Sequence, residues 1–226
     1  GCGGLSLAVA AAGGLLHYAR KQLRASVDHV HSIRPYSVKD YLVIDQTTQR
    51  NLELVRSMGG AASDTSLLKA LDETATPMGG RELKQWLLHP LREADAIRER
   101  QAVVARLLDD VAHLEEIRDL LKEVKDLERL VSRLSQGSGN ARDLVALAGS
   151  LGPFPQLRDR VTALEVDLAV KLAEQIQPQP EVVELVGRAI VDEPPVSLKE
   201  GGVIRDGYFD EVDTLRTATK DGKSWI

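Results

Sequence analysis

Apolar residues recur at spacings of three and four along most of the chain beyond residue 64, and this period constrains the fold more than any other feature. An N-cap at Asn140 predicts the start of a new helix, and further helical periods cover residues 156–176 and 180–191. The sequence therefore predicts an all-α protein, an antiparallel multi-helix bundle. The clearest period is one stripe of about six turns with charged residues on the other faces, formed by Leu114, Ile117, Leu120, Leu121, Val124, Leu127, Leu130, Val131 and Leu134.

Only short segments depart from the helical period. Tyr41-Leu42-Val43-Ile44 is a β-type run, and the prolines and glycines between residues 192 and 207 predict a very small β-hairpin. The apolar run at residues 5–16 is shorter than the ~20 residues that span a bilayer, so we expect a core helix and no membrane partner. One domain, residues 1–226, is expected to comprise an N-terminal helical region (1–30), a short strand and turn region (31–60), a helical bundle (64–191), the hairpin (192–207) and the start of a last helix (208–226).

The charge balance excludes a surface devoted to nucleic acid. The chain has 29 Lys and Arg against 34 Asp and Glu, a net charge of -5, whereas neutralising phosphates requires clustered cations in excess. Any DNA contact must be local. A single cysteine, Cys2, allows no disulfide within the chain and fits a reducing compartment. His29 and His31 lack a third ligand at a recognised spacing, so we interpret them as solvated and predict no metal, cofactor or catalytic site.

Residues 72–87 read DETATPMGGRELKQWL and place a proline and two glycines inside a helical pattern. Thr76 is an N-cap, and Pro77 suits the first helical position because its φ is already near the helical value. Two glycines in a first turn cost about 1 kcal/mol each relative to alanine, so we expect them to allow close packing against a neighbouring element. Pro90 ends the helix. The residues of this predicted tight helix junction are Thr76, Pro77, Met78, Gly79, Gly80, Leu83, Trp86 and Leu87.

Two sets of side chains in this stretch have alternative interpretations. Leu83, Trp86 and Leu87 recur at i, i+3 and i+4, so we interpret Trp86 as a core residue rather than as a platform on which bases stack. Three cations could form a local phosphate-contacting patch, although scattered surface cations are the commoner case. These cations are Arg81, Lys84 and Arg92.

The pattern D-x-T-x-T-P-M-G-x-R-x-L-x-x-W-L at residues 72–87 resembles the core, or lever, domain of the MutS family of DNA mismatch-recognition ATPases. The resemblance covers essentially the whole chain, although family members commonly carry Gly-Ser where this chain has Gly79-Gly80. The other matching segments, in the family's order, are Ala11–Tyr18, Asp45–Leu54, Glu99-Arg100-Gln101, Asp126-Leu127-Glu128-Arg129, Asn140–Leu144, and Gly201–Ile204 leading to Gly207-Tyr208.

The resemblance implies a structural and allosteric lever that links the DNA-binding clamp and mismatch-binding domains to the ATPase domains. The implied partners of the parent protein are mismatched duplex DNA, a second MutS subunit in a homodimer or heterodimer, and a MutL-like repair protein. ATP and Mg would bind the parent protein, which would be cytoplasmic and associated with the bacterial nucleoid.

Several features of the MutS family do not occur in this chain. The chain has no G-x-x-x-x-G-K-[ST] phosphate loop, no Phe-x-Glu wedge and no clamp segment. It starts without methionine, and its last helix reaches Trp225-Ile226 without a stop signal. We therefore interpret it as the first half of a split core domain, excised from a longer protein and not itself an enzyme. The alternative is a free-standing helical protein–protein interaction scaffold unrelated to repair.

Overall fold

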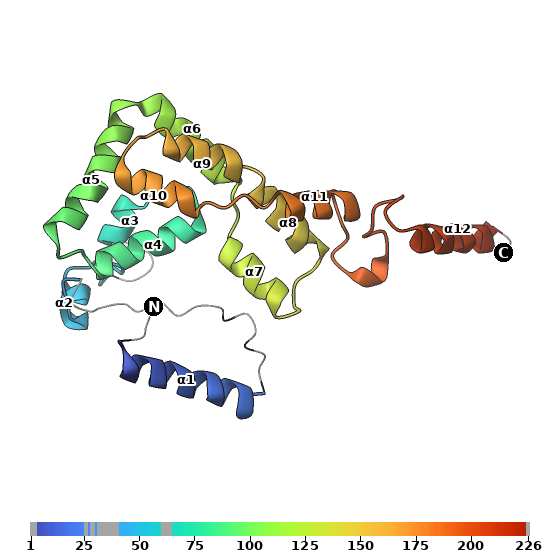
Figure 1. The fold of residues 1–226 in the computed structure, drawn as a ribbon, viewed down its shortest axis with the longest axis horizontal. Helices are drawn as coiled ribbons and strands as arrows, with labels where there is room; N and C mark the ends of the chain where they lie inside the picture. Colours follow the sequence, from blue (N-terminus) through green and yellow to red (C-terminus); the bar gives the residue numbers. More distant parts are fainter. Residues whose placement is uncertain (1–3, 25–26, 28–29, 31–40, 60–64, 225–226) are drawn as a thin grey trace.

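The computed structural model describes residues 4–24, 27, 30, 41–59 and 65–224, the last five by their backbone. The predicted all-α architecture is confirmed (Figure 1). Predictions for Cys2, His29, His31, Trp225 and Ile226 lie outside the described residues. The helices are α1 (Ser6–Lys21), α2 (Gln46–Asn51), α3 (Leu67–Leu71), α4 (Pro77–Leu88), α5 (Ala94–Asp109), α6 (Val111–Glu123), α7 (Leu127–Ser135), α8 (Ala141–Leu151), α9 (Phe154–Thr162), α10 (Asp167–Gln175), α11 (Pro180–Ala189), the 3-10 helix η3 (Leu198–Glu200) and α12 (Asp210–Ser224).

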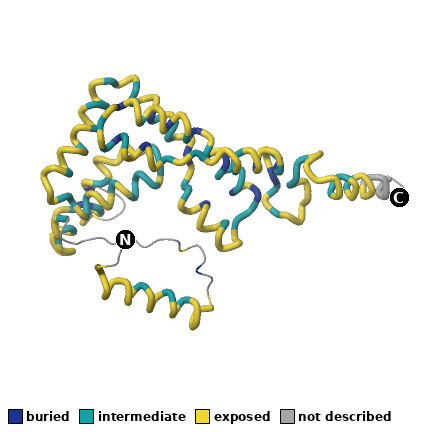
Figure 2. The backbone as a smooth tube through the Cα atoms, in the orientation of Figure 1, coloured by how far each residue is buried: buried dark blue, intermediate teal, exposed yellow. Residues whose placement is uncertain are grey.

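The helices pack around two separate apolar clusters. In the first, α5, α6, α9 and α10 surround Ile117, Leu157, Leu164 and Ala169. In the second, α8 and α11 pack together, and α7 lies against α8. In Figure 2, most of the buried stretches of the tube lie among these packed helices. The buried members of the second cluster are Ala141, Ala148, Val186 and Ile190.

The predicted six-turn helix from Leu114 to Leu134 is wrong, because the chain breaks between α6 and α7. Val124 leaves the helical region, with ψ at 110°. The Lys125 N–H donates to Ser150 Oγ at 2.9 Å, and the Asp126 side chain caps α7 by accepting from the Arg129 N–H. Side-chain partners for the backbone thus replace helical hydrogen bonds at this point. The apolar period stays in phase across the break, which explains why it predicted a single helix.

The helical period over residues 156–176 is likewise divided between two helices, α9 and α10. Glu165 lies in the turn between them with φ at 55°, a region that non-glycine residues adopt uncommonly. The two helices pack against each other and contribute Leu157 and Ala169 to the first cluster, and the turn between them contributes Leu164. The turn therefore allows one apolar period to fold back on itself.

The predicted very small β-hairpin at residues 192–207 is reduced to the pairing that closes it. One antiparallel bridge joins Ile190 to Ile204, with a Val191 N–H to Val203 O hydrogen bond of 3.1 Å. Two prolines remove backbone donors from the intervening loop. The alternating apolar and polar residues after them lead into η3, which Ser197 caps. The predicted strand at Tyr41–Ile44 is also reduced to one bridge, between Tyr41 and Leu91.

The prediction that the first helix is a core helix is wrong for the described residues. None of the residues of α1 is buried, and Leu7 and Leu15 are 86% and 69% exposed. Figure 1 shows α1 apart from the packed helices. An apolar run indicates that burying the helix would be favourable, but burial also requires another part of the protein to pack against it. Among the described helices, none combines the length and the apolar character that crossing a membrane requires.

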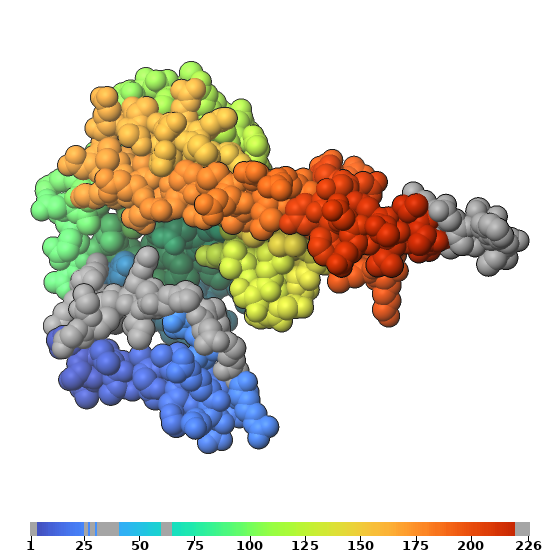
Figure 3. Space-filling view, turned by 45° about the vertical axis from the view of Figure 1, so that its right-hand side comes forward, coloured from blue at the N-terminus to red at the C-terminus, as the bar shows by residue number. Residues whose placement is uncertain are grey.

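The chain beyond α11 extends away from the packed helices, as the space-filling view in Figure 3 shows. Arg216 fixes the base of α12 by donating to the carbonyl oxygen of Ile204 at 2.7 Å and to the carboxylate of Asp206 at 2.6 Å. Leu215, in the same helix, is 67% exposed. Hydrogen bonds at its base therefore hold α12 in place.

Candidate functional site

The segment from Asp72 to Thr76 folds into a turn that starts α4. Asp72 Oδ1 accepts from the N–H of Thr74 at 3.1 Å and from its hydroxyl at 2.6 Å. The Thr74 hydroxyl bond is the main reason that the pKa of Asp72 lies below its usual value. Thr76 Oγ1 accepts from the Gly79 N–H at 3.0 Å, and Pro77 occupies the first turn of α4. The capping pattern in the sequence therefore has its expected local geometry.

The two glycines of α4 face this preceding turn. A Cβ at Gly79 would lie 3.1 Å from Thr76 Oγ1 and 3.4 Å from Thr74 Cβ. A Cβ at Gly80 would lie 3.3 Å from Thr74 Oγ1 and 3.6 Å from Asp72 Oδ2. The close neighbour of the glycine pair is thus the polar turn that begins the motif.

Arg81 joins the start of α4 to the start of α7. Its Nη1 and Nη2 atoms each donate to Asp126 at 2.8 Å, and Nη2 also donates to Glu128 Oε2. Asp126 is the N-cap of α7 and its side chain is 15% exposed. The Arg81 hydrogen bonds lower the pKa of Asp126 to about 2, and the two carboxylates raise the pKa of Arg81 further. Two sequence motifs that lie 45 residues apart therefore meet in one bidentate ion pair.

The structure does not keep the three predicted phosphate-contacting cations together as one patch. Arg81 is engaged with carboxylates of α7. Lys84 is exposed and lines a pocket with residues of α2. Arg92 is exposed on the segment after α4 and lines neither of the pockets described below. Of the three, Lys84 has both exposure and neighbours suited to an anion.

The prediction that Trp86 is a core residue is wrong, because its side chain is at the surface. Trp86 is 44% exposed, whereas Leu83 and Leu87 are partly buried. Its Nε1 donates to Glu82 Oε1 at 2.6 Å, and the Arg100 guanidinium lies 3.9 Å from the ring centroid, a cation–π geometry. Trp86 is thus at the edge of the apolar stripe and faces solvent.

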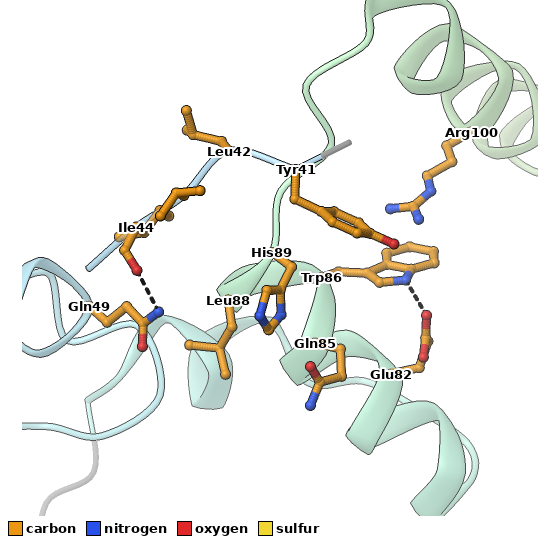
Figure 4. A pocket seen from close by; sticks show the side chains of 11 residues that line it. Tyr41, Leu42, Ile44, Gln49, Glu82, Gln85, Trp86, Leu88, His89 and Arg100 are labelled. Carbon is orange, nitrogen blue, oxygen red and sulfur yellow. Dashed lines mark hydrogen bonds between the residues drawn. The ribbon is translucent and has the colours of Figure 1, made fainter. Parts of the chain in front are cut away.

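A pocket of about 620 Å³ opens beside Trp86 (Figure 4). Tyr41 forms part of its wall and meets His89 edge to face, with ring centroids 6.0 Å apart. The Leu42 N–H donates to Pro90 O at 2.8 Å and so brings the segment before α2 against the end of α4. The other lining residues are Leu42, Val43, Ile44, Gln49, Glu82, Gln85, Leu88 and Arg100.

A second pocket of about 890 Å³ adjoins the first, since Gln49 and Leu88 line both. Its wall consists mainly of amides, hydroxyls and cations from α2, the turn after α2 and α4. The sequence does not predict this pair of pockets, because they depend on a long-range approach of residues 41–59 to α4. The remaining lining residues of the second pocket are Gln46, Thr47, Arg50, Asn51, Val55, Arg56, Ser57, Met58 and Lys84.

Within the part of the chain that the structure describes, no group of three His, Cys, Asp or Glu residues is placed to hold a metal ion. The arrangement at α4 instead offers an ion pair between helices and an exposed aromatic side chain beside cations. The ion pair can hold two helices together, and the exposed aromatic side chain and cations can bind a ligand.

The family described as MutS domain III matches residues 47–221 of this chain. The chain belongs to the MutS family. Three relatives, each named DNA mismatch repair protein MutS, match it over its whole length: those of Symbiobacterium thermophilum, Halothermothrix orenii and Methanococcoides burtonii, at 43%, 40% and 41% identity. The chain covers 26%, 25% and 26% of these relatives, and thus spans about a quarter of their length.

Membership of the MutS family gives the motifs around α4 a common context. In this MutS domain III, Arg81 of the D-x-T-x-T-P-M-G-x-R segment binds Asp126 of the D-L-E-R segment. Arg100 of the E-R-Q segment stacks on Trp86. The resemblance named these segments separately, and the structure brings them together at α4. A scaffold unrelated to repair does not account for the family match.

Proposed function

We propose that this MutS domain III is the lever of a DNA mismatch-repair protein. In this role it mechanically links the clamp and mismatch-binding parts of the parent protein to its ATPase parts. The proposal is supported by relatives that are named DNA mismatch repair proteins and are about four times as long as this chain. The domain therefore works as one part of a longer protein.

The same proposal covers the partners of the parent protein. Mismatched duplex DNA, a second MutS subunit and a MutL-like repair protein bind the parent, and ATP with Mg binds outside this chain. The parent works in the cytoplasm, associated with the bacterial nucleoid. ATP hydrolysis belongs to the rest of the parent, so magnesium-dependent ATP turnover by the pure 226-residue chain would contradict this assignment.

The ion pair between Arg81 and Asp126 is the observation that carries the lever proposal. It lies at the break between α6, which belongs to the first apolar cluster, and α7, which packs on α8 of the second. Coupling between distant sites requires an element with discrete alternative packings. A rotation of one cluster relative to the other must either move α4 with α7 or break the bidentate pair.

The test uses Arg81→Leu in the full-length parent protein. Three quantities are measured: the affinity for ATP alone, the affinity for mismatched duplex alone, and the factor by which ATP changes the affinity for the duplex. We expect the two separate affinities to stay within about twofold, while the coupling factor falls by about fivefold or more, the range of ordinary coupling energies.

Arg98→Leu is the matched control, because Arg98 pairs with Asp95 within α5 and both side chains are exposed. This control should leave the coupling factor unchanged. An unchanged coupling factor in a correctly folded Arg81→Leu protein would contradict the proposal.

A further inference from the structure

We propose that the two adjoining pockets beside α4 form a binding site for a nucleotide unit, with its ring against Trp86 and Tyr41 and its phosphate among Arg50, Arg56 and Lys84. This site goes beyond the lever function and does not depend on it. The shared residues Gln49 and Leu88 make the two pockets one continuous surface. A ligand with an aromatic and an anionic end that extends past Gln49 and Leu88 would contact both.

Three cations form the phosphate end of the proposed site. Arg50, Arg56 and Lys84 line the second pocket, and none of them forms an ion pair with another described residue. Guanidinium and ammonium groups form short, charge-assisted hydrogen bonds to phosphate oxygens. The hydroxyls of Thr47 and Ser57 add further donors to the wall.

The carboxylates near these cations are engaged elsewhere. Asp45 caps α2 and accepts from the N–H groups of Thr47 and Thr48 and from the Thr48 hydroxyl. These hydrogen bonds, above all that of the hydroxyl, lower the pKa of Asp45. Glu53 accepts from the Met58 N–H at 2.5 Å. No carboxylate is among the described residues that line the second pocket.

The ring end has the composition of a stacking site. Trp86 and Tyr41 present aromatic surface, and Arg100 stacks on Trp86 and polarises its ring. Aromatic and guanidinium faces bind bases with little sequence preference, because every base has a π-face. Glu82 is the one carboxylate among the described residues that line this pocket, and it accepts from Trp86 Nε1. Figure 4 shows these side chains around the opening.

A duplex is a poor occupant of this site. Its bases are paired and stacked, so none is free to enter the aromatic pocket unless it is unstacked at a cost in free energy. The net charge of -5 further disfavours a long double-stranded polyanion. The ligand class is therefore a free nucleotide or an unpaired nucleotide of a single strand.

Fluorescence of Trp86 provides a direct assay. The chain has two tryptophans, so Trp225→Phe leaves Trp86 as the single reporter. We expect saturable quenching by AMP or by a short oligothymidylate, and binding of ribose 5-phosphate and of adenosine at least ~10-fold weaker, since each lacks one end of the ligand. Tighter binding of AMP per nucleotide assigns the site to free nucleotides, and tighter binding of the oligonucleotide assigns it to single strands.

Variants separate the two ends of the site. Arg50→Ala with Lys84→Ala should weaken AMP by about 10-fold or more and leave adenosine unchanged, because only the phosphate loses its partners. Lys171→Ala is the control, since Lys171 is exposed on α10, away from both pockets, and the substitution also removes a lysine charge. Melting curves check that each variant is folded.

Three results would overturn the proposal. One is no saturable quenching by any nucleotide up to about 10 mM, weaker than ordinary specific binding. Another is ribose 5-phosphate binding as tightly as AMP, which would leave an anion site without a ring site. The third is an oligoglutamate peptide binding as tightly as the nucleotides, which would make the surface a docking site for acidic protein segments.

Discussion

Asp126 has two functions at one carboxylate, because it caps α7 and also receives the guanidinium of Arg81. An N-cap carboxylate is favourable where unsatisfied backbone N–H groups point out of a helix. The cation from α4 adds a second partner from a distant part of the chain. The ion pair with Arg81 requires the ionised carboxylate and so depends on pH, and the negative charge also strengthens the cap.

Asp126→Asn is predicted to reduce the stability of the chain in a pH-dependent way. The pKa of Asp126 in the folded protein is about 2, below the value of about 3.9 for an unperturbed aspartate. Its stabilising contribution is therefore complete above about pH 5 and lost as the pH falls towards the folded pKa. The stability difference between wild type and variant, from urea unfolding at several pH values, should be largest near neutrality and shrink towards pH 2.

Asp119→Asn is the control for this titration, because Asp119 pairs with Lys122 on the exposed surface of α6. Its stability difference from wild type should be small at every pH. A difference for Asp126→Asn that stays constant from pH 7 to pH 2 would show that the ion pair with Arg81 does not stabilise the fold.

Gly79→Val is predicted to destabilise the chain by about 1–3 kcal/mol through overpacking. The new side chain would start 3.1 Å from the capping oxygen of Thr76 and 3.4 Å from Thr74 Cβ. Gly149→Ala is the matched control in α8, since nothing lies within 4 Å of its Cβ position, and it should stabilise by about 0.5–1 kcal/mol. Thermal unfolding measures both, and an unchanged or raised melting temperature for Gly79→Val would contradict the account of a packed helix start.

At the scale of helices, the starts were predictable where a cap acts within three residues. Thr76 and Asn140 both cap the predicted helices, and Asn140 forms a full capping box with Asp143. The break at Asp126 was not predicted, although aspartate is also a capping residue, because the apolar period continues through it. Whether Asp126 caps a helix or lies inside one depends on its ion pair with Arg81, and the local sequence does not show that Arg81 lies nearby.

Asn140→Ala is predicted to destabilise the chain by about 1 kcal/mol, within the usual range for an N-cap. The Asn140 side chain accepts from the Asp143 N–H at 3.1 Å, and the Asp143 carboxylate accepts from the Asn140 N–H at 2.9 Å. Asp143 also pairs with Arg133 of α7, so the loosened helix start would disturb the contact between α7 and α8. Urea unfolding provides the measurement. Asn51→Ala, at the last residue of α2, has no cap to lose and should change stability much less.

For the whole molecule, the two apolar clusters explain which parts of the site were beyond sequence reasoning. The helices that build each cluster carry a period that predicts their buried faces. The pockets beside Trp86 depend on long-range contacts such as the bridge between Tyr41 and Leu91, 50 residues apart. Such a contact leaves no local pattern. The exposed position of Trp86 follows from that same arrangement, and its spacing from Leu83 and Leu87 alone predicted a core residue.

Leu164→Ala is predicted to destabilise the first cluster by about 2–5 kcal/mol, because Leu164 is 3% exposed and its truncation leaves a cavity. Hydrogen exchange should show the loss of protection in α5, α6, α9 and α10, with less change in α8 and α11. Val186→Ala, in the second cluster, should produce the opposite pattern. Equal loss of protection in all helices for both variants would mean that the two clusters unfold as one unit.

The attachment of α12 through Arg216 has a geometric consequence. Arg216 lies near the middle of the 15-residue α12 and holds it through Ile204 and Asp206, so the part of the helix beyond this anchor is about 12 Å long. A tilt of ~10° at this anchor therefore displaces the far end by roughly 2 Å, given that rise per residue. A small rotation near Arg216 is thus amplified along the helix into a displacement of about half the width of an atom at its far end.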